Sequence, residues 1–200
     1  MHTNIPESRS ASSMARAVAA SPIENPDAAY LAATTKIDID QFADGTTLDS
    51  ISDGTLTVSF SDTVAKLSVP DTWATWSSPP FSEDPTPSVL STPGNTLTLD
   101  LSRPVSIFGF ELEPSPFGEF DFTADFYRGD TLVESITRVV NGDGGARLFA
   151  REDGAIDRVV ITGIVPFAIA QVRYQLAPID PALAAVLIAL IIVILALILL

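Results

Sequence analysis

The sequence predicts an all-β protein: a two-sheet, antiparallel, jelly-roll-like sandwich followed by one C-terminal α-helix of the transmembrane type. Two observations carry this prediction. Between residues 35 and 176, apolar and polar residues alternate in short runs that Gly, Asp, Asn and Pro interrupt. This pattern is typical of half-buried antiparallel strands joined by turns. Residues 182–200 consist only of Ala, Val, Ile and Leu, which indicates an apolar helix.

The N-terminal segment, residues 1–34, is expected to form a disordered or weakly ordered arm. Ala, Ser and Pro dominate residues 10–29, a composition that buries little apolar surface. The most apolar stretch, residues 14–20, is short and contains Arg16. We therefore do not expect a secretory signal peptide.

The β-sandwich domain is expected over residues 35–176. Alternation on so many strands requires a second sheet to bury the apolar faces, so a sandwich is favoured over an open sheet, with a closed barrel as the alternative. The clearest pattern places Phe108, Phe110 and Leu112 on one face of a strand. The expected strands are residues 36–40, 46–51, 56–60, 64–69, 97–101, 105–113, 120–126, 131–140, 147–150, 157–162 and 167–176.

A long loop is expected within this domain over residues 70–94, which are rich in proline. Proline cannot donate to a β-ladder, so the segment should lie over the sheet. The loop carries Trp73 and Trp76, which are candidate ligand-binding residues. Their rings form either a lid on the core or an exposed aromatic platform for sugar rings.

Composition excludes several functions. The formal net charge is -14, from 25 acidic and 11 basic residues, which argues against nucleic-acid binding and against electrostatic docking to anionic lipid. The chain has no cysteine, which excludes disulfides, thiolate metal sites and cysteine nucleophiles. The only histidine is His2, so a Ser-His-Asp triad or a His-ligated zinc site is not expected.

The apolar C-terminal segment is expected to form a helix over residues 181–200, joined to the domain by a short linker at residues 177–180. At about 1.5 Å per residue, residues 182–200 would span roughly 28 Å, close to the thickness of a bilayer core. The alternative is a bundle of such helices from many copies, which would form a filament core. The residues expected to contact lipid are Ala182, Leu183, Val186, Leu190, Val193, Leu197 and Leu200.

Acidic residues near turns make Ca²⁺ the candidate cofactor. Asp38 and Asp40 form an Asp-x-Asp pair, and Asn141 and Asp143 lie in an Asn-Gly-Asp-Gly-Gly turn. Ca²⁺ takes six to eight oxygen ligands, which turns supply from carboxylates and carbonyls. The alternative is structural, because Asn-Gly and Asp-Gly suit tight turns without any metal.

A carboxylate pair for glycoside hydrolysis could be drawn from Glu111, Glu113, Glu119 or Asp121. Acidic residues that alternate with Phe along a strand are, however, typical of the solvent face of a half-buried sheet. We therefore expect no enzymatic activity from them.

The domain resembles a known family in several stretches. These are FADGTTLDSISDGTLTVSF at residues 42–60, PVSIFGFELEPSPFGEF at residues 104–120, and the strand patterns at residues 126–136, 144–150, 156–163 and 167–174. They resemble the β-sandwich ectodomains of bacterial PEP-CTERM-type surface proteins. The chain departs from that family because it has no Val-Pro-Glu-Pro sorting motif and no signal peptide. The resemblance implies a surface β-sandwich, lectin-like in shape, without an assigned activity.

These observations lead to one functional prediction and two alternatives. The chain is predicted to be a membrane-anchored, non-enzymatic β-sandwich of the bacterial envelope, with a structural or adhesion role and a bilayer as its partner. One alternative is a Ca²⁺-dependent carbohydrate-binding module that uses Trp73 and Trp76. The other is a filament subunit, whose partners are copies of itself held by the apolar C-terminal helix.

Overall fold

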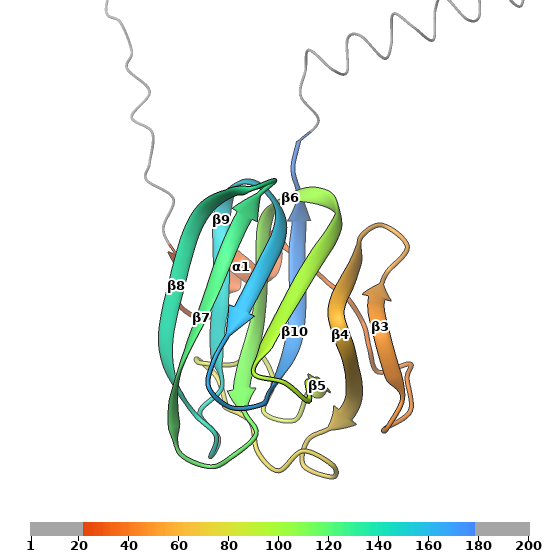
Figure 1. Ribbon diagram of the computed structural model, residues 1–200, viewed down its shortest axis with the longest axis vertical. Helices are drawn as coiled ribbons and strands as arrows, with labels where there is room; N and C mark the ends of the chain where they lie inside the picture. Colours follow the sequence, from red (N-terminus) through yellow and green to blue (C-terminus); the bar gives the residue numbers. More distant parts are fainter. Residues whose placement is uncertain (1–21, 179–200) are drawn as a thin grey trace, which may run out of the picture.

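The computed structural model describes residues 22–178, apart from the side chain of Asp153. It is an all-β, antiparallel, sandwich-like fold, as predicted (Figure 1). The elements are β1 (Pro22–Ile23), α1 (Ala28–Ala33), β2 (Thr35–Lys36), β3 (Thr47–Ser52), β4 (Thr57–Ser68), β5 (Ser88–Ser91), β6 (Thr96–Pro114), β7 (Glu119–Arg128), β8 (Thr131–Asn141), β9 (Arg147–Thr162) and β10 (Phe167–Leu176).

Two layers form the sandwich, and the long strands β6 and β9 belong to both. The front layer pairs β3, β4, the first half of β6, the second half of β9, β7 and β8. The back layer pairs β1, the first half of β9, the second half of β6, and β10, with β2 and β5 on β10. Because β5 pairs with both β4 and β10, it joins the two layers along one side.

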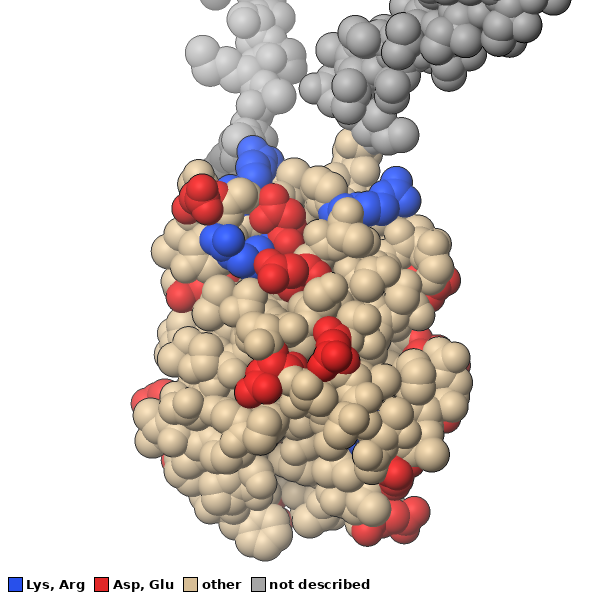
Figure 2. Space-filling model, turned by 45° about the vertical axis from the view of Figure 1, so that its right-hand side comes forward, with Lys and Arg blue, Asp and Glu red and all other residues tan. Residues whose placement is uncertain are grey.

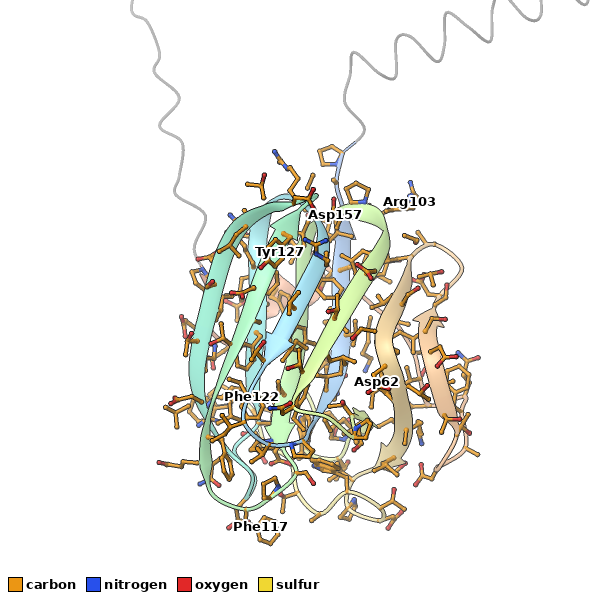
Figure 3. The ribbon with its side chains drawn as sticks, in the orientation of Figure 1. Asp62, Arg103, Phe117, Phe122, Tyr127 and Asp157 are labelled. Atoms are coloured by element: carbon orange, nitrogen blue, oxygen red, sulfur yellow. The ribbon has the colours of Figure 1, made fainter. Side chains whose placement is uncertain are left out.

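β6 and β9 bend together at one end of the sandwich, which we call the exit pole because β10 also ends there. Their register is interrupted between Asp100 and Val105 of β6. Pro104 cannot donate to the ladder, and Gly154 of β9 has a φ of 116° that favours glycine. Figure 3 places Arg103 and Asp157 at this pole and Phe117 at the opposite end, the far pole.

The core lies between the layers and follows the predicted alternation. Phe108, Phe110 and Leu112 of β6 are fully buried, as expected from their shared face. Across the layers, Phe122 of the front meets Phe167 of the back, with ring centroids 5.4 Å apart. Such aromatic pairs add to stability beyond the apolar area they bury. The contact between Phe122 and Phe167 therefore helps to hold the two layers together.

The outer face of the back layer is also covered, partly by the N-terminal segment. Asp27 caps α1 by accepting a hydrogen bond from the Tyr30 amide at 2.8 Å. Tyr30 is buried over Gly109, where an added Cβ would lie 2.4 Å from the tyrosine oxygen. Residues 22–34 therefore pack on the domain, in the C-terminal part of the segment for which a disordered or weakly ordered arm was predicted. They do so because the capped helix α1 places the Tyr30 side chain in the space that Gly109 leaves open.

The proline-rich segment covers another part of this outer face, over β10 and the end of β6. It forms the expected loop over most of residues 70–94, but contains the short strand β5, which was not expected. No proline interrupts residues 88–92, and Val89 and Leu90 are fully buried. This segment can therefore pair with β4 and β10 despite the surrounding prolines.

The predicted C-terminal helix and its lipid-contacting residues lie outside the described residues, as does part of the linker. Within residues 22–178, no helix is long and apolar enough to cross a bilayer.

Candidate functional site

Two buried glutamates on the outer face of β6 form the most unusual feature of the domain. Glu111 and Glu113 have 0% of their surface exposed, although they point away from the core formed by Phe110 and Leu112. The loop of residues 70–87 lies over them. The prediction that both occupy a solvent face is therefore wrong, because the outer face of this strand is covered.

Glu111 is held by three donors from the loop. The indole Nε1 of Trp76 donates to Oε2 at 2.8 Å, and the Ser82 hydroxyl lies 2.5 Å from the same oxygen. The backbone N–H of Glu83 donates to Oε1 at 2.7 Å. One carboxyl group thus binds three points of a segment about thirty residues away in sequence.

Glu113 holds the start of the same loop. The indole Nε1 of Trp73 donates to its Oε2 at 2.8 Å, and the Thr75 hydroxyl lies 3.4 Å from Oε1. Thr75 in turn accepts a hydrogen bond from the Gly144 amide at 3.1 Å. This contact ties the loop to the turn between β8 and β9.

Burial raises the pKa of Glu111 and of Glu113 to about 7. The hydrogen bonds from Ser82 and Trp76 act in the opposite direction for Glu111, and that from Trp73 does so for Glu113. The donors are neutral indole, hydroxyl and amide groups, so they only partly offset the cost of burying a negative charge. Each carboxyl group therefore keeps its proton at pH values at which an exposed glutamate has already lost it.

The hydrogen-bond geometry of Ser82 independently fits a protonated Glu111. Its hydroxyl oxygen lies 2.5 Å from Glu111 Oε2 and 2.9 Å from the Asp84 carbonyl oxygen, yet it carries a single proton. If Glu111 is ionised, Ser82 can donate to only one of these two oxygens. If Glu111 carries the proton, it donates to Ser82, and Ser82 donates to Asp84, so both short contacts become hydrogen bonds.

An ion-pair cluster borders the glutamates and fixes the other side of the loop. Arg173 of β10 binds Glu83 through two nitrogens at 2.6 and 2.8 Å, and Lys36 lies 3.2 Å from the same carboxylate. Burial alone would raise the pKa of Glu83, but Arg173 and Lys36 outweigh it and hold that pKa below its usual range. Arg173 also donates to the Thr34 carbonyl at 3.2 Å, which connects loop, sheet and N-terminal segment.

The predicted tryptophan platform is not exposed. Trp73 and Trp76 are 9% and 6% exposed, and they pack with Val69, Val89 and the alanines of β10. The rings therefore form the lid that was the other interpretation of this loop. The sequence analysis did not predict that Glu111 and Glu113 accept hydrogen bonds from these indoles. The available signal was the two Trp side chains themselves, because a buried indole N–H requires an acceptor.

The remaining carboxylate candidates are exposed at the far pole side of the front layer. Glu119 and Asp121 of β7 lie on the solvent face, as the alternation indicated. Glu119 and Asp121 are thus separated from the buried pair Glu111 and Glu113 on β6.

The calcium candidates lie in two separate turns. Asp38 accepts a hydrogen bond from the Asp40 amide, and Asn141 accepts one from the Asp143 amide, each at 2.9 Å. Both contacts are local turn-stabilising bonds, which matches the structural interpretation. Within the described part of the chain, no group of three or more His, Asp or Glu side chains is placed to hold a metal ion.

Comparisons with known proteins complete the description. No protein-family model matches the chain, and no curated protein matches it, so the resemblance to PEP-CTERM-type domains stays a prediction. The chain is similar to family 29 carbohydrate-binding module CBM29_1 from Piromyces equi, with 12% identity, a TM-score of 0.33, and coverage of 74% of this chain and 93% of that one. It is also similar to the enzymatically active domain of bacteriophage CBA120 tailspike protein 4, with 18% identity and a TM-score of 0.30 over 62% of this chain, which spans 20% of the tailspike chain. At these TM-scores neither similarity carries an argument about function.

Proposed function

We propose that this chain is a membrane-anchored, non-enzymatic β-sandwich with an adhesion or structural role. The position of β10 is the observation that carries this proposal. β10 pairs with β2, β5 and β6 in the back layer and ends at Leu176, at the exit pole. Residues 177–181 alone separate it from the apolar residues 182–200, so an anchor there would hold the exit pole close to the bilayer.

The charge at the exit pole is compatible with this orientation. Figure 2 shows most of the Lys and Arg side chains of the visible face at this end, near the place where β10 leaves the sandwich, with Asp and Glu side chains among them. Arg103 and Arg128 are exposed, and the Arg158 guanidinium lies 4.7 Å from the centre of the Tyr127 ring. Basic groups beside a membrane reduce the repulsion between an acidic domain and anionic headgroups.

A non-enzymatic role is supported by the use that the domain makes of its perturbed carboxyl groups. Raised pKa values often mark catalytic acids. Here, however, Glu111 and Glu113 are enclosed, and loop donors occupy their oxygens. A substrate could reach them only if the loop left the sheet. Their task is to hold the loop, and through it both tryptophans, on the back layer.

Membrane flotation of the full chain tests the proposal. We expect the protein to float with vesicles and to resist extraction at high pH, whereas a variant lacking residues 182–200 should stay in solution. Leu190→Arg is the matched point variant, because a charge at the centre of a spanning helix costs roughly 2.5–3.5 kcal/mol. Flotation that is unchanged by both variants would refute the anchor, and lipid-independent pelleting of long polymers would favour the filament alternative.

Glycan binding is a second candidate function, and one surface feature favours it. A cavity of about 180 Å³ at the far pole is lined by Trp73, Thr75, Ser115 and Phe117, among others. Phe117 is 66% exposed, so it offers the open aromatic face that the buried tryptophans do not. Loss of signal on a glycan array for Phe117→Ala would support this function, whereas an array on which the unmodified protein shows no signal would remove it.

A further inference from the structure

The outer edge of β8 is the longest open strand edge of the domain. β8 is the last strand of the front layer, and among the described strands it pairs only with β7 (Figure 1). Residues 131–140 of this 11-residue strand therefore present backbone donors and acceptors along one side of the sandwich, whereas Asn141 already bonds to Gly145. Leu132 and Val139 of this strand are 50% and 58% exposed. Such an edge readily accepts a further strand.

The charges of β8 are complementary to a second copy of β8 in one arrangement. If two copies pair antiparallel about a two-fold axis at Ile136, Glu134 of one faces Arg138 of the other. In a parallel, in-register pair, Glu134 would face Glu134 and Arg138 would face Arg138. Opposite charges facing each other stabilise a strand pair and like charges destabilise it, so the sequence of this edge selects the antiparallel pair.

Both charged side chains are already positioned by the domain. Glu134 accepts a hydrogen bond from Arg151 Nε at 2.6 Å, and Arg138 pairs with Glu24 while its guanidinium lies 5.8 Å from the centre of the Phe149 ring. Their side chains remain 21% and 16% exposed. A second copy would therefore meet side chains whose rotamers are largely fixed, which lowers the entropy cost of docking.

We propose that β8 is a homotypic docking edge, through which two copies of this chain join their front layers as one continuous antiparallel sheet. A two-fold axis perpendicular to the strands reverses their direction, so the two exit poles lie at opposite ends of the pair. Together with the proposed anchor, on which this step rests, the two C-terminal segments then enter different membranes. The docked pair is an adhesive bridge between two like surfaces.

Cysteine crosslinking of the full chain tests the register. The chain has no cysteine, so a single introduced thiol reports one position. Ser135 and Thr137 are exposed and would face each other across the axis. A mixture of Ser135→Cys and Thr137→Cys proteins, treated with a short bis-maleimide, should give about tenfold more crosslinked dimer than Thr47→Cys on β3, the exposed control edge. Equal yields for the mixture and the control would overturn the docking edge.

Vesicle clustering by variants of opposite charge tests whether the docked pair bridges two membranes. Ser135→Lys/Thr137→Lys and Ser135→Glu/Thr137→Glu each place like charges opposite one another, so either variant alone should cluster vesicles about tenfold less than the unmodified chain. Mixing the Lys vesicles with the Glu vesicles should restore clustering. Crosslinks confined to single vesicles would overturn the bridge, because they require both anchors in one membrane.

The outcomes separate this inference from the proposed function. A protein that floats with membranes but gives no β8 crosslink refutes the docking edge and leaves the anchor intact. A protein that does not float refutes the anchor, and the crosslink yield measured in solution then still decides the docking edge.

Discussion

Replacing Glu111 with Gln should weaken the pH dependence of stability, because it removes a proton-binding group from beneath the loop. The pKa of Glu111 is about 7 in the folded domain, against an ordinary value of 4.5. Between these values the folded chain holds a proton that the unfolded chain has released. The stabilisation from this proton is therefore complete below pH 4.5 and is lost as the pH rises through about 7.

The size of the effect follows from the same two values. The difference between about 7 and 4.5, at about 1.4 kcal/mol per pH unit, corresponds to about 3.5 kcal/mol. For a domain of this length that is about 7–14 °C in Tm. Glu113 acts in the same direction. Its pKa is raised to the same value of about 7, so we expect a contribution of similar size from it.

Thermal unfolding of the full chain in micelles, at constant ionic strength between pH 5 and pH 8, measures this effect. The Tm of the unmodified protein should fall as the pH rises, and Glu111→Gln should remove about half of that slope, because Glu113 supplies the rest. The absolute Tm is a poorer measure, because Gln can donate to Ser82 but leaves the Trp76 indole without its acceptor. Glu119→Gln is the matched control, since Glu119 is exposed on β7, and it should keep the full slope. An unchanged slope in Glu111→Gln would refute the reasoning, as would an unmodified protein whose Tm rises between pH 5 and pH 8.

Three further predictions concern the covered outer face. Gly109→Ala should lower the free energy of unfolding by about 1–3 kcal/mol in urea titrations, because the new Cβ would lie 2.4 Å from both the Tyr30 oxygen and the Ala150 Cβ. Tyr30→Phe should raise it by about 1 kcal/mol in the same assay, because the hydroxyl is buried without a hydrogen-bond partner in the described structure. Trp76→Phe should lower it by about 2–3 kcal/mol and make the Tm fall more steeply with pH, because the Glu111 carboxylate loses a donor. A pH slope for Trp76→Phe as shallow as that of Glu111→Gln would contradict this account.

The sandwich was predictable because its main signal is local. Alternation such as that of Phe108, Phe110 and Leu112 needs only neighbouring residues to show which side of a strand is apolar. Turn residues such as Gly142 and Gly145, which approach other backbone closely, likewise mark the strand ends. Both kinds of evidence lie within one strand or one turn.

The buried glutamates could not be predicted in the same way. Alternation shows that Glu111 and Glu113 lie opposite the core face, but not whether another segment covers that side. The cover comes from residues 70–87, and the acceptors that Trp73 and Trp76 require could have been any buried oxygen. Which oxygen is used depends on the path of a long loop, and that path is set by contacts such as Arg173 with Glu83, far apart in sequence.

The N-terminal segment illustrates the same limit at smaller scale. α1 has six residues, too few to be stable alone, so its composition gave little sign of order. Tyr30 supplies the missing stabilisation through burial, but only because Gly109 leaves room for it on β6. The ordered structure of residues 22–34 thus depends on Tyr30 and Gly109 together, which lie far apart in sequence.

The net charge of -14 sets a condition on docking through β8. Two copies that approach each other repel at long range, whereas the contact between Glu134 and Arg138 forms only at short range. Salt at about 0.1 M limits the repulsion to roughly 10 Å, while a partly buried ion pair is screened less. Moderate salt should therefore strengthen the association of two copies, because it weakens the repulsion between the domains more than the contact between Glu134 and Arg138. An adhesive edge of this kind would pair at physiological ionic strength and stay apart in dilute buffer, because the repulsion belongs to the whole domain and the attraction to one strand.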